Sequence, residues 1–263
     1  MSKRVVSLAA GLVFAFSFMP ALASAQTNWT GPYAGVEGGA VFSMGSVANA
    51  APRASSSGLI NYFGVIPTSP GAIASGASQS PTGTGGTVGG VVGYLRQFGP
   101  LVGGIETDFS YFGYTASSNG TGSYSLFLGQ QQFFVSQKIQ TDWLWTVRPR
   151  IGFAVDDWLF SASGGIAVSN VKYSFTFNDP LSVASAYGAQ TNIGWTIGAA
   201  VEKALGPHWS AKGEFLYVDL GTVSAGTQLN GSGLLSGVTL ANTFAATASL
   251  RTGVVRAGLS YRF

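Results

Sequence analysis

The final stretch LRTGVVRAGLSYRF, residues 250–263, decides the fold because its polarity alternates residue by residue. One face is apolar and ends in aromatic rings; it consists of Gly253, Val255, Ala257, Leu259, Tyr261 and Phe263. The opposite face carries Arg256 and Arg262. Because successive side chains of a strand point to opposite sides of a sheet, the stretch is predicted to be a β-strand with one apolar and one charged face.

The composition does not suit an ordinary soluble surface. Only 9% of the 263 residues are charged, while 46% are hydrophobic and 38 are glycine, whereas a soluble surface is about a quarter or more charged. The absence of cysteine excludes a disulfide scaffold. The formal net charge of +3 falls to +1 without Lys3 and Arg4, which contribute one charge each. So weak a basic balance argues against a nucleic-acid partner.

Residues 1–25 are predicted to be a secretory signal peptide cleaved after Ala25. Lys3 and Arg4 precede an apolar run from Val5 to Met19, and small residues end the segment. The alternative is an uncleaved membrane anchor, but the run is shorter than the roughly 20 apolar residues that a spanning helix needs. Residues 26–263 then form a single domain.

Eight strand-like segments follow one another between turn signals, near 31–42, 87–98, 101–114, 137–154, 158–177, 191–205, 208–220 and 249–263. The connections alternate between tight turns and longer stretches, and the longer ones are 43–86, 115–136, 178–190 and 221–248. This asymmetry is typical of outer-membrane barrels, in which short periplasmic turns alternate with long extracellular loops.

Alternation inside the strands indicates which face meets lipid. Between residues 138 and 153, the apolar face is Ile139, Trp143, Trp145, Val147, Ile151 and Phe153, and charged residues lie opposite. A soluble barrel or sandwich with the apolar face inward is the alternative, but it leaves few charges outside. Lipid offers no hydrogen bonds to a sheet edge, so a spanning sheet has to close on itself. The predicted fold is all-β: a closed eight-stranded antiparallel up-and-down transmembrane β-barrel.

The enclosed face predicts a network of charges in the lumen. Its six acids and six bases are Glu37, Glu106, Asp108, Asp142, Glu202, Glu214, Lys138, Arg148, Arg150, Lys212, Arg256 and Arg262. Equal numbers of both signs suit an enclosed space, because unpaired buried charge is costly. We interpret the network as structural filling, because eight strands leave a lumen that side chains just fill. An ion-selective or catalytic cluster is the alternative.

Aromatic residues gather at the strand ends beside the tight turns. A periplasmic girdle is predicted from Trp29, Tyr33, Phe98, Trp158, Trp209, Tyr261 and Phe263. The terminal strand that ends on Phe263 is also the expected signal for the barrel-assembly machinery. The alternative for these rings is the core of a soluble sandwich.

Six short motifs follow one another along the chain: NWTGPYAG at 28–35, DWLWTVRPRIG at 142–152, SGGIA at 163–167, GWTIGA at 194–199, EFLYVDLG at 214–221 and the terminal YRF. In this order they resemble the Omp25/Omp31-like outer-membrane surface antigens of α-proteobacteria. The resemblance covers the strands and none of the long loops. It implies an eight-stranded barrel of a porin-like or immunogenic kind. Pro149, where the family commonly has a small residue, and the long stretch 43–86 depart from it.

Three functions remain open from the sequence. The first is structural: a barrel among outer-membrane lipid and lipopolysaccharide that displays loops 43–86 and 221–248 to host or surface ligands. The second is a narrow porin-like channel for small solutes or ions. The third is a receptor, for instance for haem, with Tyr62 and Tyr187 as candidate axial ligands.

An enzyme, a cofactor and a metal site are not expected. The chain has one histidine, His208, and it lies in a predicted turn beside Pro207. Without cysteine, and with so little histidine, only carboxylates remain as metal ligands. The pair Asp156 and Asp157 is most simply a hairpin turn.

Overall fold

The computed structural model describes residues 27–263 except 55–57, 59, 64–68 and 127–128. Within these residues the strands are β1 (Gly31–Ser43), β2 (Val47–Ala54), β3 (Thr82–Phe98), β4 (Leu101–Leu126), β5 (Gly129–Val155), β6 (Trp158–Asn178), β7 (Ser182–Ala204), β8 (Trp209–Gly231) and β9 (Thr239–Arg262). Two short helices accompany them, α1 (Ser69–Gly76) and the 3-10 helix η1 (Gly233–Leu235). Neither of these helices is long and apolar enough to cross a membrane.

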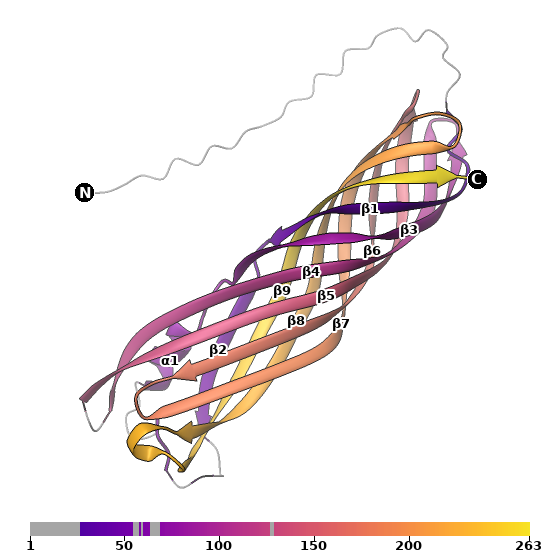
Figure 1. The fold of residues 1–263 in the computed structure, drawn as a ribbon. Coiled ribbons are helices and arrows are strands. Elements are labelled where there is room, and N and C mark those ends of the chain that lie inside the picture. The colour runs from indigo at the N-terminus through magenta and orange to yellow at the C-terminus, as the bar shows by residue number, and fades with distance from the viewer. Residues whose placement is uncertain (1–26, 55–57, 59, 64–68, 127–128) are drawn as a thin grey trace, which may run out of the picture.

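The strands form one antiparallel sheet that curves into a barrel (Figure 1). Strands β3 to β9 pair in chain order, and β1 pairs with both β3 and β9. Strand β2 pairs with residues 242–249 of β9, directly beyond the residues that β1 pairs with. The sheet thus has nine strand segments where the sequence predicts eight strands, because the first wall position is interrupted after Ser43 and continues as β2.

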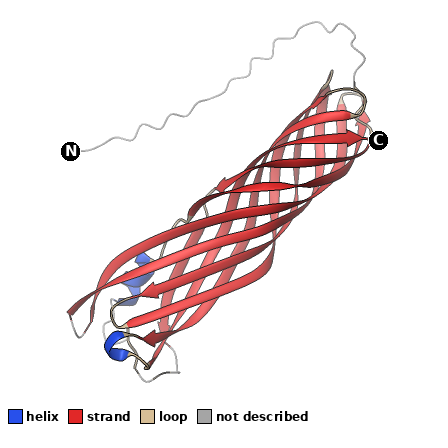
Figure 2. Cartoon of the chain, in the orientation of Figure 1, coloured by secondary structure: helices blue, strands red, loops and turns tan. Residues whose placement is uncertain are grey.

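The strands are much longer than the sequence suggested. Strand β4 has 26 residues and β5 has 27, whereas roughly 9 to 11 residues cross a bilayer. The stretches predicted as loops at 115–136, 178–190 and 221–248 lie mostly in strands. They were mistaken for loops because their Ser-, Thr- and Gly-rich sequence lacks an outward apolar face. Figure 2 shows these strand extensions, with both helices at the end opposite the C-terminus.

The half of the barrel near the C-terminus carries an outward apolar band. On β4 this band runs from Leu101 to Tyr111, with Ile105 52% and Phe109 59% exposed. Neighbouring strands continue it with Ile151, Ile193 and Ile197. Its height of about ten residues matches the strand length that spans the hydrocarbon of a bilayer.

Strand β5 changes phase where the band ends. Toward the end of β5 at Val155, the inward residues are Thr146, Arg148 and Arg150. Toward its start at Gly129, the inward residues are instead Phe133, Val135 and Ile139. Register shifts in both neighbouring ladders mark the change, between Tyr111 and Tyr114 and between Gln140 and Leu144. The expectation that Ile139 shares a lipid face with Trp145 is therefore wrong.

Side chains bind the backbone where these ladders are interrupted. The Thr141 hydroxyl donates to the Phe112 carbonyl at 2.8 Å, and the Asp142 amide donates to the Asn170 side chain at 3.0 Å. These bonds replace ladder contacts that a regular sheet would make. These hydrogen bonds therefore stabilise the phase change of β5.

We call the half of the barrel beyond the phase change, away from the C-terminus, the outer half. It has an apolar interior and a polar exterior. Its core includes inward side chains of β4, β5, β6, β8 and β9, together with residues of the stretch between β1 and β3. Each arrangement weighed from the sequence thus describes one half of the barrel, apolar outside near the C-terminus and apolar inside beyond the phase change.

Candidate functional site

Nine charged side chains meet inside the half that carries the apolar band. We call them the ion-pair cluster: Glu37, Glu106, Asp108, Glu202, Glu214, Arg148, Arg150, Lys212 and Arg256. They come from β1, β4, β5, β7, β8 and β9, and all of them are buried. Strand register places some partners directly opposite each other, because Glu106 pairs with Arg148 and Glu214 pairs with Arg256 across neighbouring strands.

Arg148 is the most enclosed base of the cluster, with a fully buried side chain. Its Nη2 donates to Glu106 at 2.6 Å and to Asp108 at 3.0 Å, and its Nη1 donates to Glu214 at 2.8 Å. These three acids lie on β4 and β8, so one guanidinium joins two separate parts of the wall. Planar guanidinium groups suit such multiple contacts with carboxylates.

The other three bases extend the cluster across the lumen. The Lys212 ammonium lies 3.2 Å from Glu37 and 3.1 Å from Glu106. The guanidinium of Arg256 contacts Glu37, Asp108 and Glu214, and that of Arg150 contacts Glu106 and Glu202. Most members therefore have partners on two or more strands, which holds the wall together from the inside.

Tyr33 adds a neutral donor that the sequence did not assign to the lumen. Its hydroxyl donates to Glu106 at 2.6 Å and accepts a hydrogen bond from Arg150 at 3.0 Å. Trp29 is also enclosed, with 1% of its surface exposed. The placement of Trp29 and Tyr33 in a lipid-facing girdle is therefore wrong, because both rings are buried inside the end of the barrel near the C-terminus.

Two predicted members of the network lie outside the barrel. Lys138 is exposed, and Asp142, 49% exposed, pairs with Lys172 on the outer surface. The prediction that Lys138 and Asp142 point inward is wrong, because it extended one alternation through the phase change of β5. A hydrogen bond from Lys172 lowers the pKa of Asp142. Arg262 lies closer to the C-terminal end of the barrel than the cluster does, with its guanidinium 4.9 Å from the Trp29 ring centre.

The remaining predicted girdle residues lie near the strand ends of the same half. Phe98, Trp158, Trp209 and Phe263 are exposed, and Tyr261 contacts Trp209, His208 and Phe263 edge-on or stacked. A second row of rings, which sequence analysis missed, lies at the opposite margin of the apolar band and consists of Tyr111, Trp143, Trp195 and Tyr217. The missing signal was the phase change, which fixes where the band ends.

Within the predicted surface loop 43–86, residues 60–63 and 69–79 fold into the outer half of the lumen, whereas β2 lies in the wall. We call residues 60–63 and 69–79 the inserted segment. Tyr62, Phe63, Ile73 and Ala77 are each at most 1% exposed. Helix α1 approaches β4 closely at Gly120, where an added Cβ would lie 2.3 Å from the Gly76 carbonyl oxygen. Small residues in the wall thus make room for the helix.

Asp179 anchors the inserted segment to the connection between β6 and β7. Its carboxylate accepts hydrogen bonds from the hydroxyls of Tyr62 and Tyr124 and from the amides of Leu181 and Ser182. Burial, followed by the negative charge of Asp179, raises the pKa of Tyr62 to about 12. The phenol therefore stays a donor throughout the physiological range.

The two candidate haem ligands are not brought together. The Tyr62 hydroxyl is bound to Asp179 inside the lumen, at 3.2 Å. Tyr187 lies on β7 and points outward with 65% of its surface exposed. In the described part of the chain, no group of three or more His, Cys, Asp and Glu side chains is arranged to hold a metal ion. His208 lies in a turn, 2.9 Å from the Arg262 carbonyl oxygen.

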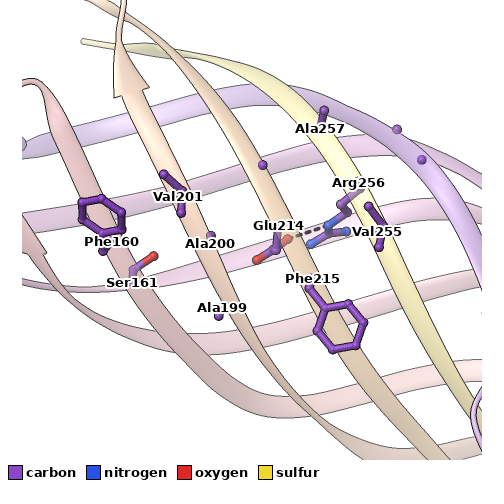
Figure 3. A pocket seen from close by; sticks show the side chains of 13 residues that line it. Phe160, Ser161, Ala199, Ala200, Val201, Glu214, Phe215, Val255, Arg256 and Ala257 are labelled. Atoms are coloured by element: carbon purple, nitrogen blue, oxygen red, sulfur yellow. Dashed lines mark hydrogen bonds and ion pairs between the residues drawn. The ribbon is translucent and has the colours of Figure 1, made fainter. Parts of the chain in front are cut away.

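A shallow hollow of about 940 Å³ lies on the outward face of β6 to β9 (Figure 3). Phe160, Val201, Phe215 and Val255 surround it, and the small residues between them give it depth. Glu214 and Arg256 also line it, and Figure 3 shows the contact between their side chains. The hollow lies within the apolar band, where lipid chains are the surrounding medium.

The sequence of the chain is similar to those of known outer-membrane proteins. Residues 9–263 match the model described as outer membrane protein beta-barrel domain. The chain is 37% identical to the 31 kDa outer-membrane immunogenic protein of Brucella melitensis over 140 residues, 52% of this chain and 55% of that protein. It is 30% identical to the 22 kDa outer membrane protein of Rhizobium leguminosarum over 144 residues, 55% and 56% of the two chains. The matches thus span about half the length of these curated relatives.

The fold is also similar to that of a solved structure. The crystal structure of OprG from Pseudomonas aeruginosa aligns with a TM-score of 0.46 and 14% sequence identity. The alignment covers 90% of this chain and 98% of OprG.

Proposed function

Because the chain belongs to the outer membrane protein β-barrel family, we propose that this outer-membrane protein is a structural barrel that displays its outer half at the cell surface. The observation that carries this proposal is the ion-pair cluster, which fills the lumen at the level of the apolar band. We further propose that the barrel is not an enzyme and supports no steady flow of solutes.

The proposal includes a wall closed by eight strand positions. Residues 33–43 of β1 pair one by one with residues 252–262 of β9, which supports closure of the sheet on itself. Counting β1 and β2 as one interrupted position gives eight. A bilayer favours this arrangement because an open edge would leave backbone groups without partners.

Two fillings in series argue against the narrow channel. Arg148 on β5 reaches Glu214 on β8, and Lys212 on β8 reaches Glu106 on β4, so charged side chains bridge the lumen. Above them the inserted segment fills the outer half with apolar side chains. An ion would have to displace both layers, and breaking buried ion pairs is costly.

The outer half offers the surface for display. Its extended strands present polar residues such as Lys138, and η1 exposes Leu234 with 86% of its surface accessible. We propose that this half contacts lipopolysaccharide near the outer aromatic row and meets host or surface ligands above it. We also propose that β9 is the strand read by the barrel-assembly machinery.

Single-channel recording in planar bilayers tests the proposal. The wild-type protein is expected to give no sustained open steps. A variant that lacks residues 60–79 and has Arg148, Glu106 and Glu214 all neutralised serves as a positive control, because it loosens both fillings. Sustained steps from the wild-type protein would contradict the proposal and favour the porin-like channel. Surface display is tested separately by labelling Lys138 on intact cells, and labelling only after permeabilisation would reject it.

A further inference from the structure

The inserted segment delivers one phenyl ring into an aromatic chamber inside the outer half. The Phe63 ring makes edge contacts with Tyr62, Tyr124, Phe177 and Phe244 at centroid distances of 5.0 to 6.0 Å. Edge-to-face pairs of this kind are each worth about 0.5 to 1.5 kcal/mol beyond the area they bury. Phe63 therefore occupies a place shaped for an aromatic ring.

The walls of this chamber do not belong to the segment that fills it. Tyr124 lies on β4, Phe177 on β6 and Phe244 on β9. Further rings support them, because Phe133 stacks on Phe177 and Phe175 contacts Phe244. The wall strands thus form most of an aromatic enclosure by themselves, and a chain segment from outside the barrel wall supplies its occupant.

Near Phe63 the segment is held chiefly by polar contacts. The Asn242 side chain accepts from the Tyr62 amide at 2.7 Å and donates to Asn61 at 3.0 Å. The Tyr62 hydroxyl donates to Asp179, and the Ala241 amide donates to the Ile60 carbonyl at 2.6 Å. Hydrogen bonds of this kind contribute only about 1 kcal/mol each, because water replaces them when they break. Exchange of this occupant is therefore cheaper than unfolding of the wall.

We propose that the aromatic chamber is a binding site for a small aromatic molecule, which competes with the Phe63 ring for the same place. The chamber lies in the outer half, so the molecule enters from the cell exterior. The ion-pair cluster lies beneath it, which makes the chamber a receptor site with a closed floor. Barrels of eight strands are wide enough for one small ligand, and the apolar cavity that Phe63 leaves when it moves out is lined by rings that suit a benzene-like molecule.

Fluorobenzene titration, followed by fluorine NMR on the protein in lipid nanodiscs, tests the proposal. Empty nanodiscs provide the correction for partition into lipid. The wild-type protein is expected to bind fluorobenzene at one saturable site. Phe63→Ala is expected to bind at least about tenfold more tightly, because no ring then competes for the chamber. Phe109→Ala, which truncates a lipid-facing phenylalanine of β4, is the matched control and should keep the wild-type affinity.

Two results would overturn the proposal. The first is the absence of saturable binding to the wild-type protein above the empty nanodiscs. The second is equal affinity of the wild-type protein and Phe63→Ala, which would place the fluorobenzene elsewhere. If Phe63→Ala does not fold, Phe63→Leu replaces it, since it keeps most of the apolar volume. An affinity at least about threefold above wild type then supports competition, and an unchanged affinity rejects it.

Discussion

Replacing Arg148 by alanine is expected to lower the free energy of unfolding of the barrel more than the same replacement of any arginine outside the ion-pair cluster. Arg148 is fully buried and binds Glu106, Asp108 and Glu214. Its removal leaves the five acids of the cluster with three bases. Truncating one partner of a buried ion pair costs about 3 to 5 kcal/mol, because the remaining charge is stranded away from water.

Urea-induced unfolding in lipid vesicles measures this cost. The matched control is Arg251→Ala, which removes an arginine that also pairs with an acid, Asp219, but is 45% exposed. Exposed pairs contribute about 0 to 1 kcal/mol, so the free energy of unfolding should hardly change. If Arg148→Ala is as silent as Arg251→Ala, the cluster is not a buried structural element.

The double variant Arg148→Ala with Asp108→Asn refines the test. After the loss of Arg148, the Asp108 carboxylate keeps its contact with Arg256 and the hydrogen bond that it accepts from the Thr146 hydroxyl. Neutralising it removes one stranded charge, so the double variant should recover part of the lost stability. Residues in one network couple by about 0.5 to 3 kcal/mol in such cycles. Strict additivity of the two single effects would contradict the contact geometry.

Three further predictions concern the inserted segment, the cell surface and the closure of the wall. The raised pKa of Tyr62, about 12 against an ordinary 10, means that its burial stabilises the protein fully below pH 10 and that this contribution is lost as the pH rises through about 12. In an alkaline absorbance titration, Tyr62→Phe should lack this transition, and an identical titration curve would refute the assignment. Proteinase K on intact cells should cut at η1 near Leu234, 86% exposed; cleavage confined to permeabilised cells would reverse the orientation. Val36→Cys and Leu259→Cys, directly opposite each other on β1 and β9, should form a disulfide on oxidation, whereas Val36→Cys with a cysteine on β5 should not, and failure of the first pair would argue against closure.

The half of the barrel that carries the apolar band was predictable from the sequence, because a single alternation of inward and outward residues runs through its strands. Glu106 and Asp108 on β4, and Arg148 and Arg150 on β5, share a face by residue parity alone, and the structure brings all four together. The partners of each charge were not predictable, because strand register depends on how the wall closes. Parity identifies a face but not a contact.

The outer half was predicted wrongly, because the alternation of apolar and polar residues along β5 does not show where the strand changes phase. Ile139 and Trp145 have the same parity and are both apolar, yet one faces the core and the other faces lipid. The pattern therefore continued smoothly through a point where the wall reverses its polarity. Lys138 was placed in the lumen for this reason.

The inward position of the inserted segment was also not predicted from the sequence. Tyr62, Phe63 and Ile73 stand out as large apolar residues in a background rich in Ser, Ala, Gly and Pro. Such residues are unusual in a solvated loop and were the available signal. Their destination was not predictable, because it required knowing that the wall above the membrane has an apolar interior.

The interior of this one barrel changes from charged to apolar at the phase change of β5. Spin labels at single cysteines along residues 133–153 test it most directly, since the chain has no native cysteine. Electron paramagnetic resonance then measures access of oxygen from lipid and of a polar relaxant from water. We expect oxygen access at odd positions from 145 to 153 and relaxant access at even positions from 134 to 140, with odd positions from 133 to 141 shielded from both. One unbroken alternation, with 139 as open to oxygen as 145, would contradict it.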